Sequence, residues 1–173
     1  MVSNLKVDKI QSVAGTTTAM TIDSVGRVGQ PNKPAFEAWY TGSNMTFNSG
    51  SNAGLTFNNV EQQGGTNFST STGKFTVPVT GIYFFSLLNN TYDVDANNYF
   101  RHGVLFNGTG FGTDEQHILG YWTTGDTGDH SMSSSFVRKL TAGDTVQPFV
   151  RVEETGYGSA GRMWQNFSGF LVG

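Results

Sequence analysis

The sequence predicts an all-β protein built as a sandwich or a barrel. From Ala35 onward, short segments of β-branched and aromatic residues follow one another at a regular spacing, separated by turn residues. Aromatic residues make up 13% of the chain and glycines number 23, a composition typical of strands joined by tight turns. Charged residues are only 13%, which excludes a disordered chain. No segment has the periodicity expected of a helix.

The first 33 residues differ from the rest because they contain few aromatics and end in the turn-rich segment GRVGQPNKP. Two short strands are predicted there, at 4–11 and 19–28. Their apolar residues include Leu5, Val7, Ile10, Met20 and Ile22. Such a small set cannot form a stable core, so the segment either docks on the body or winds around other copies of itself. We therefore divide the chain into an arm, 1–33, and a domain, 34–173.

The domain alternates strands with turns along its whole length. We expect strands at 35–41, 45–48, 55–62, 66–71, 73–80, 81–90, 98–108, 116–124, 130–140, 144–154 and 163–172. Asn107-Gly108 has the composition of a tight hairpin turn, and Ala142-Gly143-Asp144 indicates another. Pro148 lacks a backbone N–H, so we expect it at an edge or bulged position.

The segment Thr72 to Leu88 predicts that subunits associate. Its first half alternates, with Phe75, Val77 and Val79 on one face. Its second half, IYFFSLL, places large apolar side chains on both faces of a strand, so both faces need to be covered. In a chain without helices, one face can pack on the second sheet and the other on a neighbouring subunit.

Composition also limits the partners and the compartment. The net charge is -3 and there is no run of Lys or Arg, so we expect no nucleic-acid partner. Cysteine is absent, which suits folding in a reducing cytoplasm. No apolar stretch has the length of a signal peptide or of a membrane span, so we expect no membrane insertion.

No group of residues has the spacing of a catalytic site. The three histidines show no ligand or general-base spacing, and Ser133 to Ser135 lack the turn that exposes a nucleophile. We therefore predict that the protein is not an enzyme. Four carboxylates between strands are candidate calcium ligands, weighed against ordinary solvated turn acids: Asp93, Asp95, Asp126 and Asp129.

Aromatic residues are the other candidates for function. Those on central strands are expected in the core or at a subunit interface, and five are assigned to the interface: Trp39, Tyr83, Phe85, Tyr99 and Trp164. Tyr121, Trp122 and Tyr157 lie beside turns, where an exposed ring can stack on a sugar. Packing at a strand end is the alternative for these three.

Several segments, taken in their order along the chain, resemble those of one family. They are PAFEAWY, TGKFTVPVTGIYFFS, VLFNGTGF, SMSSSFVRKLTAGDTVQPFV and FSGFLV. Residues 34–173 are thereby similar to the globular C1q-like domain of the C1q/TNF superfamily. The resemblance implies a ten-stranded jelly-roll β-sandwich that assembles as a homotrimer and binds partners through its outer loops without catalysis. Some members hold calcium near the threefold axis, which strengthens the candidacy of the four aspartates.

In place of the collagen stalk of animal members stands LKVDKIQSVAGTTTAMTIDSVGRV, which resembles N-terminal segments of fibre and structural proteins of tailed bacteriophages, notably cyanophages. The two resemblances imply a homotrimeric short fibre or spike on the virion surface, assembled in the bacterial cytoplasm. The arm is expected to contact other virion proteins, and the head a host-surface glycan. Two alternatives remain: a capsid decoration protein and a secreted non-viral C1q-like lectin.

Overall fold

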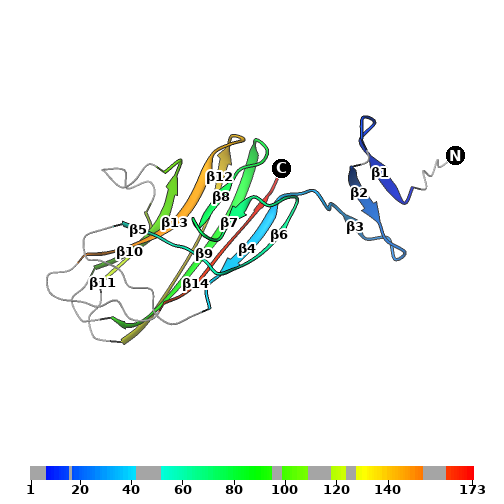
Figure 1. Cartoon of the computed structure of the whole chain (residues 1–173). Helices are drawn as coiled ribbons and strands as arrows, with labels where there is room; N and C mark the ends of the chain where they lie inside the picture. The colour runs from blue at the N-terminus through cyan, green and yellow to red at the C-terminus, as the bar shows by residue number, and fades with distance from the viewer. Residues whose placement is uncertain are drawn as a thin grey trace.

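The computed structural model describes residues 7–15, 17–41, 52–94, 99–108, 118–123, 128–153 and 163–173. Every regular element in these ranges is a β-strand. In the same ranges no helix is long and apolar enough to span a membrane. The strands form a small sheet near the N-terminus and a larger sandwich, which a linker connects (Figure 1).

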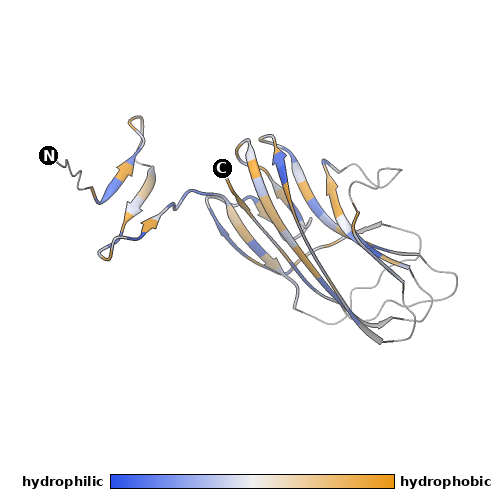
Figure 2. Ribbon diagram, turned by 180° about the vertical axis from the view of Figure 1, so that it is seen from behind, coloured by the Kyte–Doolittle hydropathy of each residue, from blue (hydrophilic) through white to orange (hydrophobic). Residues whose placement is uncertain are grey.

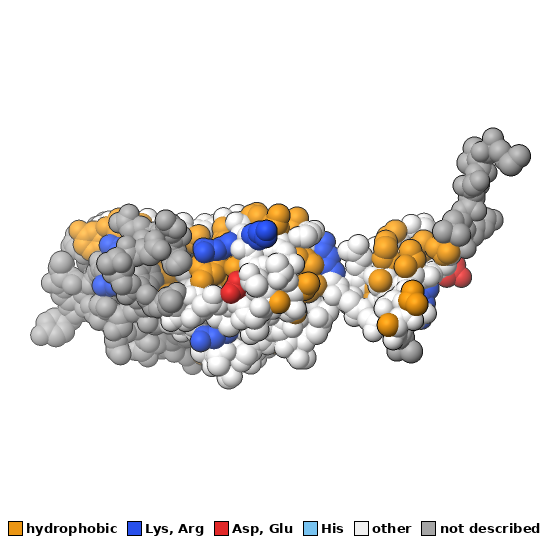
Figure 3. Space-filling model, turned by 90° about the horizontal axis from the view of Figure 1, so that it is seen from above, with side chains coloured by type: hydrophobic (Ala, Val, Ile, Leu, Met, Phe, Trp, Pro, Cys, Tyr) orange, Lys and Arg blue, Asp and Glu red, His pale blue; other side chains and the backbone are white. Residues whose placement is uncertain are grey.

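The arm is a three-stranded antiparallel sheet of β1 (Lys9–Gln11), β2 (Thr18–Ile22) and β3 (Val28–Gly29). The sequence predicted two strands; β3 is added because the chain folds back after β2. None of the described arm side chains is buried, and Val25 is 73% exposed. Figure 3 shows apolar side chains gathered on the surface of this sheet. The arm therefore has no core of its own, and Leu5 lies outside the described residues.

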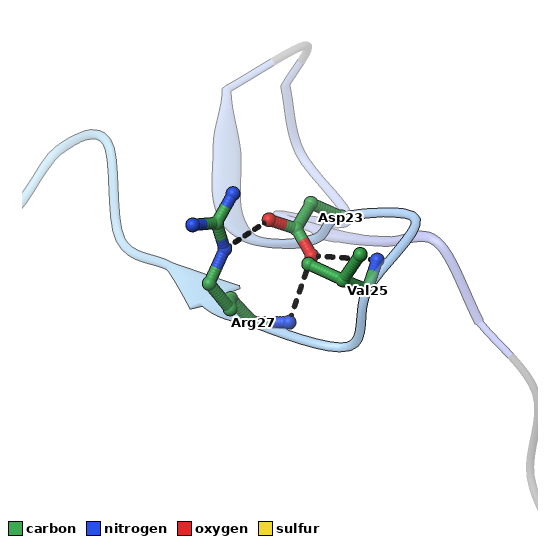
Figure 4. Close-up of polar contacts among 3 residues, drawn as sticks. All are labelled: Asp23, Val25 and Arg27. Carbon is green, nitrogen blue, oxygen red and sulfur yellow. Dashed lines mark hydrogen bonds and ion pairs between the residues drawn. The ribbon is translucent and has the colours of Figure 1, made fainter.

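A polar turn holds β2 and β3 together. Asp23 Oδ1 accepts hydrogen bonds from the backbone N–H groups of Val25 and Arg27, at 3.0 and 2.9 Å, and Oδ2 accepts one from Arg27 Nε at 2.6 Å (Figure 4). These hydrogen bonds, above all those from Arg27, lower the pKa of the Asp23 carboxyl. The turn of the arm is therefore stabilised by local hydrogen bonds and not by buried side chains.

The body is a sandwich of two antiparallel sheets, as predicted for a jelly roll. The five-stranded sheet runs in the order β12 (Gly128–Leu140), β9 (Gly81–Val94), β14 (Met163–Leu171), β4 (Ala35–Trp39), β6 (Asn59–Gln63). The six-stranded sheet runs β11 (Ile118–Thr123), β10 (Tyr99–Phe106), β13 (Thr145–Glu153), β8 (Lys74–Thr76), β7 (Phe68–Ser69), and β5 (Asn52–Gly54) also pairs with β13. In Figure 2 hydrophobic residues alternate with hydrophilic ones along these strands.

Aromatic rings fill the interior beside the first half of β9. Phe85 is 0% exposed, and its ring centroid lies within 6.4 Å of five other rings, those of Phe36, Phe75, Tyr83, Phe136 and Phe167. Gly169 is paired with Phe85 across the sheet, and a Cβ there would lie 2.6 Å from the Phe85 ring. A side chain at Gly169 would therefore displace the Phe85 ring.

Some boundaries differ from the prediction. The strand expected at 55–62 begins only at Asn59, although Leu55 and Phe57 before it are buried. Val79 is 44% exposed because β8 ends at Thr76, so it leaves the face that Phe75 and Val77 share. The segment 45–48 lies outside the described residues.

Pro148 occupies a central strand and not an edge. On one side it is paired with Val104 of β10. On the other side β8 pairs with 145–146 and β5 with 149–151, so the missing N–H falls between these two partners. Asn107 and Gly108 both have positive φ, 54° and 65°, as the predicted tight turn requires.

Candidate functional site

The five-stranded sheet has a second apolar face, which points away from the sandwich. Along β9 the residues Tyr83, Phe85 and Leu87 are buried inside, while Ile82 and Phe84 point outward. Phe84 is paired with Val137 on one side and Phe170 on the other, with 5.2 Å between the two phenylalanine rings. We name these outward residues the apolar patch: Ile82, Phe84, Val137, Phe170 and Val172.

A polar row borders the apolar patch. Paired positions on the five strands supply three serines and two glutamates: Ser135, Ser86, Ser168, Glu37 and Glu61. Glu37 and Glu61 are paired, and two like charges directly opposite each other are unfavourable in a sheet. Asn166 Nδ2 donates a hydrogen bond to Glu37 Oε1 at 2.7 Å. The outward face therefore has an apolar end beside the linker and a more polar middle.

The structure does not bring the five predicted interface aromatics together. Trp39 and Trp164 lie on the outward face of the five-stranded sheet, and Trp164 is 57% exposed. Tyr99 lies on the six-stranded sheet, packed against Tyr121. Tyr83 and Phe85 were assigned wrongly, because both are fully buried in the single chain. Both faces of β9 carry apolar side chains, as the sequence predicted, and the alternation puts Phe84 and not Phe85 on the outward face.

A buried polar cluster lies beside the second half of β9. Asn89 Nδ2 lies 3.0 Å from His102 Nδ1, His102 Nε2 lies 2.8 Å from Ser134 Oγ, and Ser134 Oγ lies 3.2 Å from the Leu119 carbonyl oxygen. The cluster joins β9 and β12 of one sheet to β10 and β11 of the other. Burial lowers the pKa of His102 to about 4, so its ring is neutral at pH 7.

The hydrogen bonds of this cluster all run in one direction. Asn89 donates from Nδ2, so His102 Nδ1 is the acceptor and the ring proton is on Nε2. That N–H donates to Ser134, whose hydroxyl in turn donates to Leu119. The residue types resemble a serine–histidine–amide triad, but a nucleophile would have to donate its proton to the histidine. Here the serine accepts, so the cluster ties the sheets together.

A cleft of about 560 Å³ opens beside the polar cluster, between β11 and β12. The ring centroids of Trp122 and His130 lie 3.8 Å apart there. Gly120 lies against His102, and a Cβ at that glycine would be 2.5 Å from Nε2. The backbone of β11 thus approaches the imidazole closely. We name this feature the β11–β12 cleft.

Tyr121 and Trp122, two of the three aromatics predicted to bind sugar, both line this cleft, although they lie on opposite faces of β11. Trp122 is paired with the buried Phe100 and turns toward the interior at the cleft. Tyr121 is on the opposite face of β11, with its ring 5.3 Å from the Arg101 guanidinium carbon. Tyr157 lies outside the described residues.

The calcium candidates stay predictions. Asp95 and Asp126 lie outside the described residues, and the side chains of Asp93 and Asp129 are likewise not described. Within the described part of the chain no three His, Asp or Glu side chains are grouped as metal ligands would be.

The C1q domain family model matches residues 35–172, which is the whole sandwich. The chain belongs to the C1q domain family. Complement C1q tumor necrosis factor-related protein 3 of Mus musculus is 28% identical over 141 residues, covering 80% of this chain and 52% of the mouse protein. The chain therefore spans about half the length of that relative.

A solved structure agrees with the C1q fold. The globular domain of zebrafish complement 1qA protein superimposes with a TM-score of 0.60 at 21% identity, over 82% of this chain and 98% of the zebrafish chain. The arm and the linker precede the matched residues, which begin at residue 35. C1q domains are generally binding proteins and not enzymes.

Proposed function

We propose that this protein is a structural protein of a tailed-bacteriophage virion. It forms a homotrimeric short fibre or spike on the tail or capsid surface, whose arm attaches to the particle and whose C1q head binds a host-surface glycan. The arm carries the proposal, because it lies outside the C1q match, has no core, and exposes apolar residues such as Ile10 and Val25. Its sequence also resembles phage fibre segments.

The apolar patch supports the trimer. C1q domains typically form trimers, and monomeric proteins rarely expose a contiguous apolar surface of this kind. Phe84, Val137 and Phe170 form a continuous row across three strands, so a copy of the same face is a suitable cover. We assign the subunit contact to this patch together with Trp39 and Trp164.

The position of the linker supports a shared axis for heads and arms. Leu171 N–H donates to the Pro34 carbonyl at 2.9 Å, and Lys33 Nζ donates to the Val172 carbonyl at 3.3 Å. The arm thus leaves the head beside the apolar patch. Three heads joined through that patch bring three arms close together, where Met20 and Ile22 can pack against their copies or against a virion protein.

Repetition supplies the binding strength that this role requires. Three identical heads per trimer, and many trimers per particle, convert weak single contacts into useful avidity. A cytoplasmic site of assembly in the bacterial host belongs to the same proposal.

Deletion of residues 1–33 tests the role of the arm. The head has its own core, so the truncated protein is expected to fold and to trimerise, as measured by light scattering, but to be missing from purified particles. Normal incorporation of the truncated head would contradict the attachment role. Cryo-electron microscopy of the intact particle distinguishes a tail spike from a capsid decoration protein.

A second candidate is a secreted or cell-surface lectin of non-viral origin. The animal origin of both similar proteins favours it. Recovery of the native protein from an exported fraction, and not from phage particles, would establish this candidate instead.

A further inference from the structure

We propose that the β11–β12 cleft binds an uncharged pyranose ring. This inference rests on the proposed function, because it assigns the glycan contact of the head to one site. Two of the aromatics predicted from the sequence, Tyr121 and Trp122, line this cleft, which combines an aromatic wall with fixed hydrogen-bonding groups.

The cleft lies between the open edges of two sheets. β11 is the last strand of the six-stranded sheet and β12 is the last strand of the five-stranded sheet. Edge strands present backbone N–H and C=O groups that no further strand of their sheet pairs. A hydroxyl-rich ligand can satisfy such groups from both edges. The volume of about 560 Å³ falls within the usual range for small-ligand sites.

One wall of the cleft is aromatic and held in place. The ring centroid of Trp122 lies 3.8 Å from that of His130 and 6.3 Å from that of Phe100. Its indole is therefore held by two neighbouring rings. A rigid aromatic ring loses little conformational entropy on binding and presents an apolar face. That face suits the axial C–H groups of a sugar ring.

The other wall presents an oriented hydroxyl. Ser134 Oγ accepts a hydrogen bond from His102 Nε2 and donates one to the Leu119 carbonyl, so one lone pair of its oxygen remains to accept a hydrogen bond from a ligand hydroxyl. The cluster thus fixes the direction of hydrogen bonding before a ligand arrives.

The cleft favours a neutral ligand. None of the described residues that line it is Asp, Glu, Lys or Arg, and His102 is held in its neutral form. A carboxylate or phosphate entering the cleft would lose solvation without a charged partner. The site therefore selects against acidic sugars.

Nuclear magnetic resonance of the full-length protein labelled with ¹⁵N tests the proposal without mutation. The chain has three tryptophans, Trp39, Trp122 and Trp164, whose indole N–H signals are assigned by single Trp→Phe variants. Methyl pyranosides of glucose, galactose and mannose are titrated at millimolar concentrations. The Trp122 signal is expected to shift with at least one of them, while the other two signals stay unchanged. No shift with any of the three sugars would overturn the proposal.

Substitutions on the two walls of the cleft, each with a control on the same strand, test where the sugar binds. Trp122→Leu and Ser134→Ala are each expected to weaken the sugar affinity about fivefold. Thr123→Ala and Ser135→Ala are the controls, because each changes the other neighbour of the tested residue on the same strand and neither residue lines the cleft. Equal losses in the controls would overturn the location. Circular dichroism shows whether each variant is folded. If a variant is not folded, the titration of the wild-type protein alone tests whether the cleft binds sugar.

A sugar that carries a carboxylate tests the preference of the cleft for a neutral ligand. Methyl glucuronide differs from methyl glucoside by a carboxylate in place of the hydroxymethyl group, and it is expected to bind at least about tenfold more weakly. Tighter binding of the glucuronide would overturn the preference for neutral sugars. Failure of the cleft is distinguishable from failure of the virion role: in the first case particles carrying the cleft variants adsorb normally, and in the second the protein binds sugar but is absent from particles.

Discussion

The interior of the sandwich has two regions that are built on the same strands and are stabilised differently. Beside the first half of β9, Phe85 and its neighbours form a cluster of packed aromatic rings. Beside the second half, Asn89, His102 and Ser134 form a chain of hydrogen bonds between the sheets. In the aromatic region stability comes from buried area and tolerates small changes of shape. In the polar region it depends on every donor finding its acceptor.

The largest effect is expected from a charge in the aromatic region. Phe85→Asp places a carboxylate among five rings and removes the ring they surround, at a cost of at least about 5 kcal/mol, so the domain should fail to fold. The far-ultraviolet circular dichroism spectrum and solubility report this outcome.

Phe84→Asp is the control, since Phe84 directly precedes Phe85 on β9 and points outward. This variant should keep the fold and chiefly dissociate the oligomer, as measured by analytical ultracentrifugation. Two variants that both remain stable oligomers would contradict the assignment of the two faces of β9.

The polar region should make stability depend on pH. The folded pKa of His102, about 4, lies below its unfolded value of about 6.5, so the unfolded state binds the additional proton. The stabilisation is complete above about pH 6.5 and is lost as the pH falls toward 4, by about 3 kcal/mol in all. Urea unfolding at a series of pH values measures it.

Two comparisons isolate the contribution of this histidine. The lowered pKa values of Asp23 and Asp144 lie below 3.8, so their contributions are lost only at lower pH. His102→Gln should flatten the profile between pH 6.5 and 4. An unchanged slope in that variant would show that other groups cause the dependence.

The strands of the first region could be predicted from the sequence, but the inward position of Tyr83 and Phe85 was missed, and the second region was not predicted at all. Segments of β-branched and aromatic residues at regular spacing, with turn residues between them, indicated the strands and an all-β sandwich, because these signals are local. Asn89, His102 and Ser134 come from three strands, and their meeting depends on the register of both sheets. A local signal was present nevertheless: Asn89 and His102 occupy inward positions of their strands, where the alternation predicts apolar residues. The inward set also shows why Phe85 could not belong to an interface.

A smaller effect is expected at the edge of the polar region. Ser134→Ala removes the acceptor of the His102 N–H and leaves a buried donor without a partner, at a cost of about 1 to 2 kcal/mol. Ser133→Ala, on the outward face of the same strand, should be near neutral. Thermal unfolding of both variants measures the difference, and equal melting temperatures would argue against a stabilising role for the cluster.

The smallest effect is expected from a hydroxyl in the aromatic region. Tyr83 donates to the Val79 carbonyl at 2.7 Å, and burial raises the pKa of its phenol. Tyr83→Phe deletes this hydrogen bond but keeps the ring against Phe75 and Phe85. Because 78–80 is an exposed segment, water can replace the hydroxyl at Val79, and the loss should be about 0.5 kcal/mol. A loss as large as that of Ser134→Ala would mean that both regions depend on hydrogen bonds, because the aromatic packing that remains in Tyr83→Phe would then not suffice.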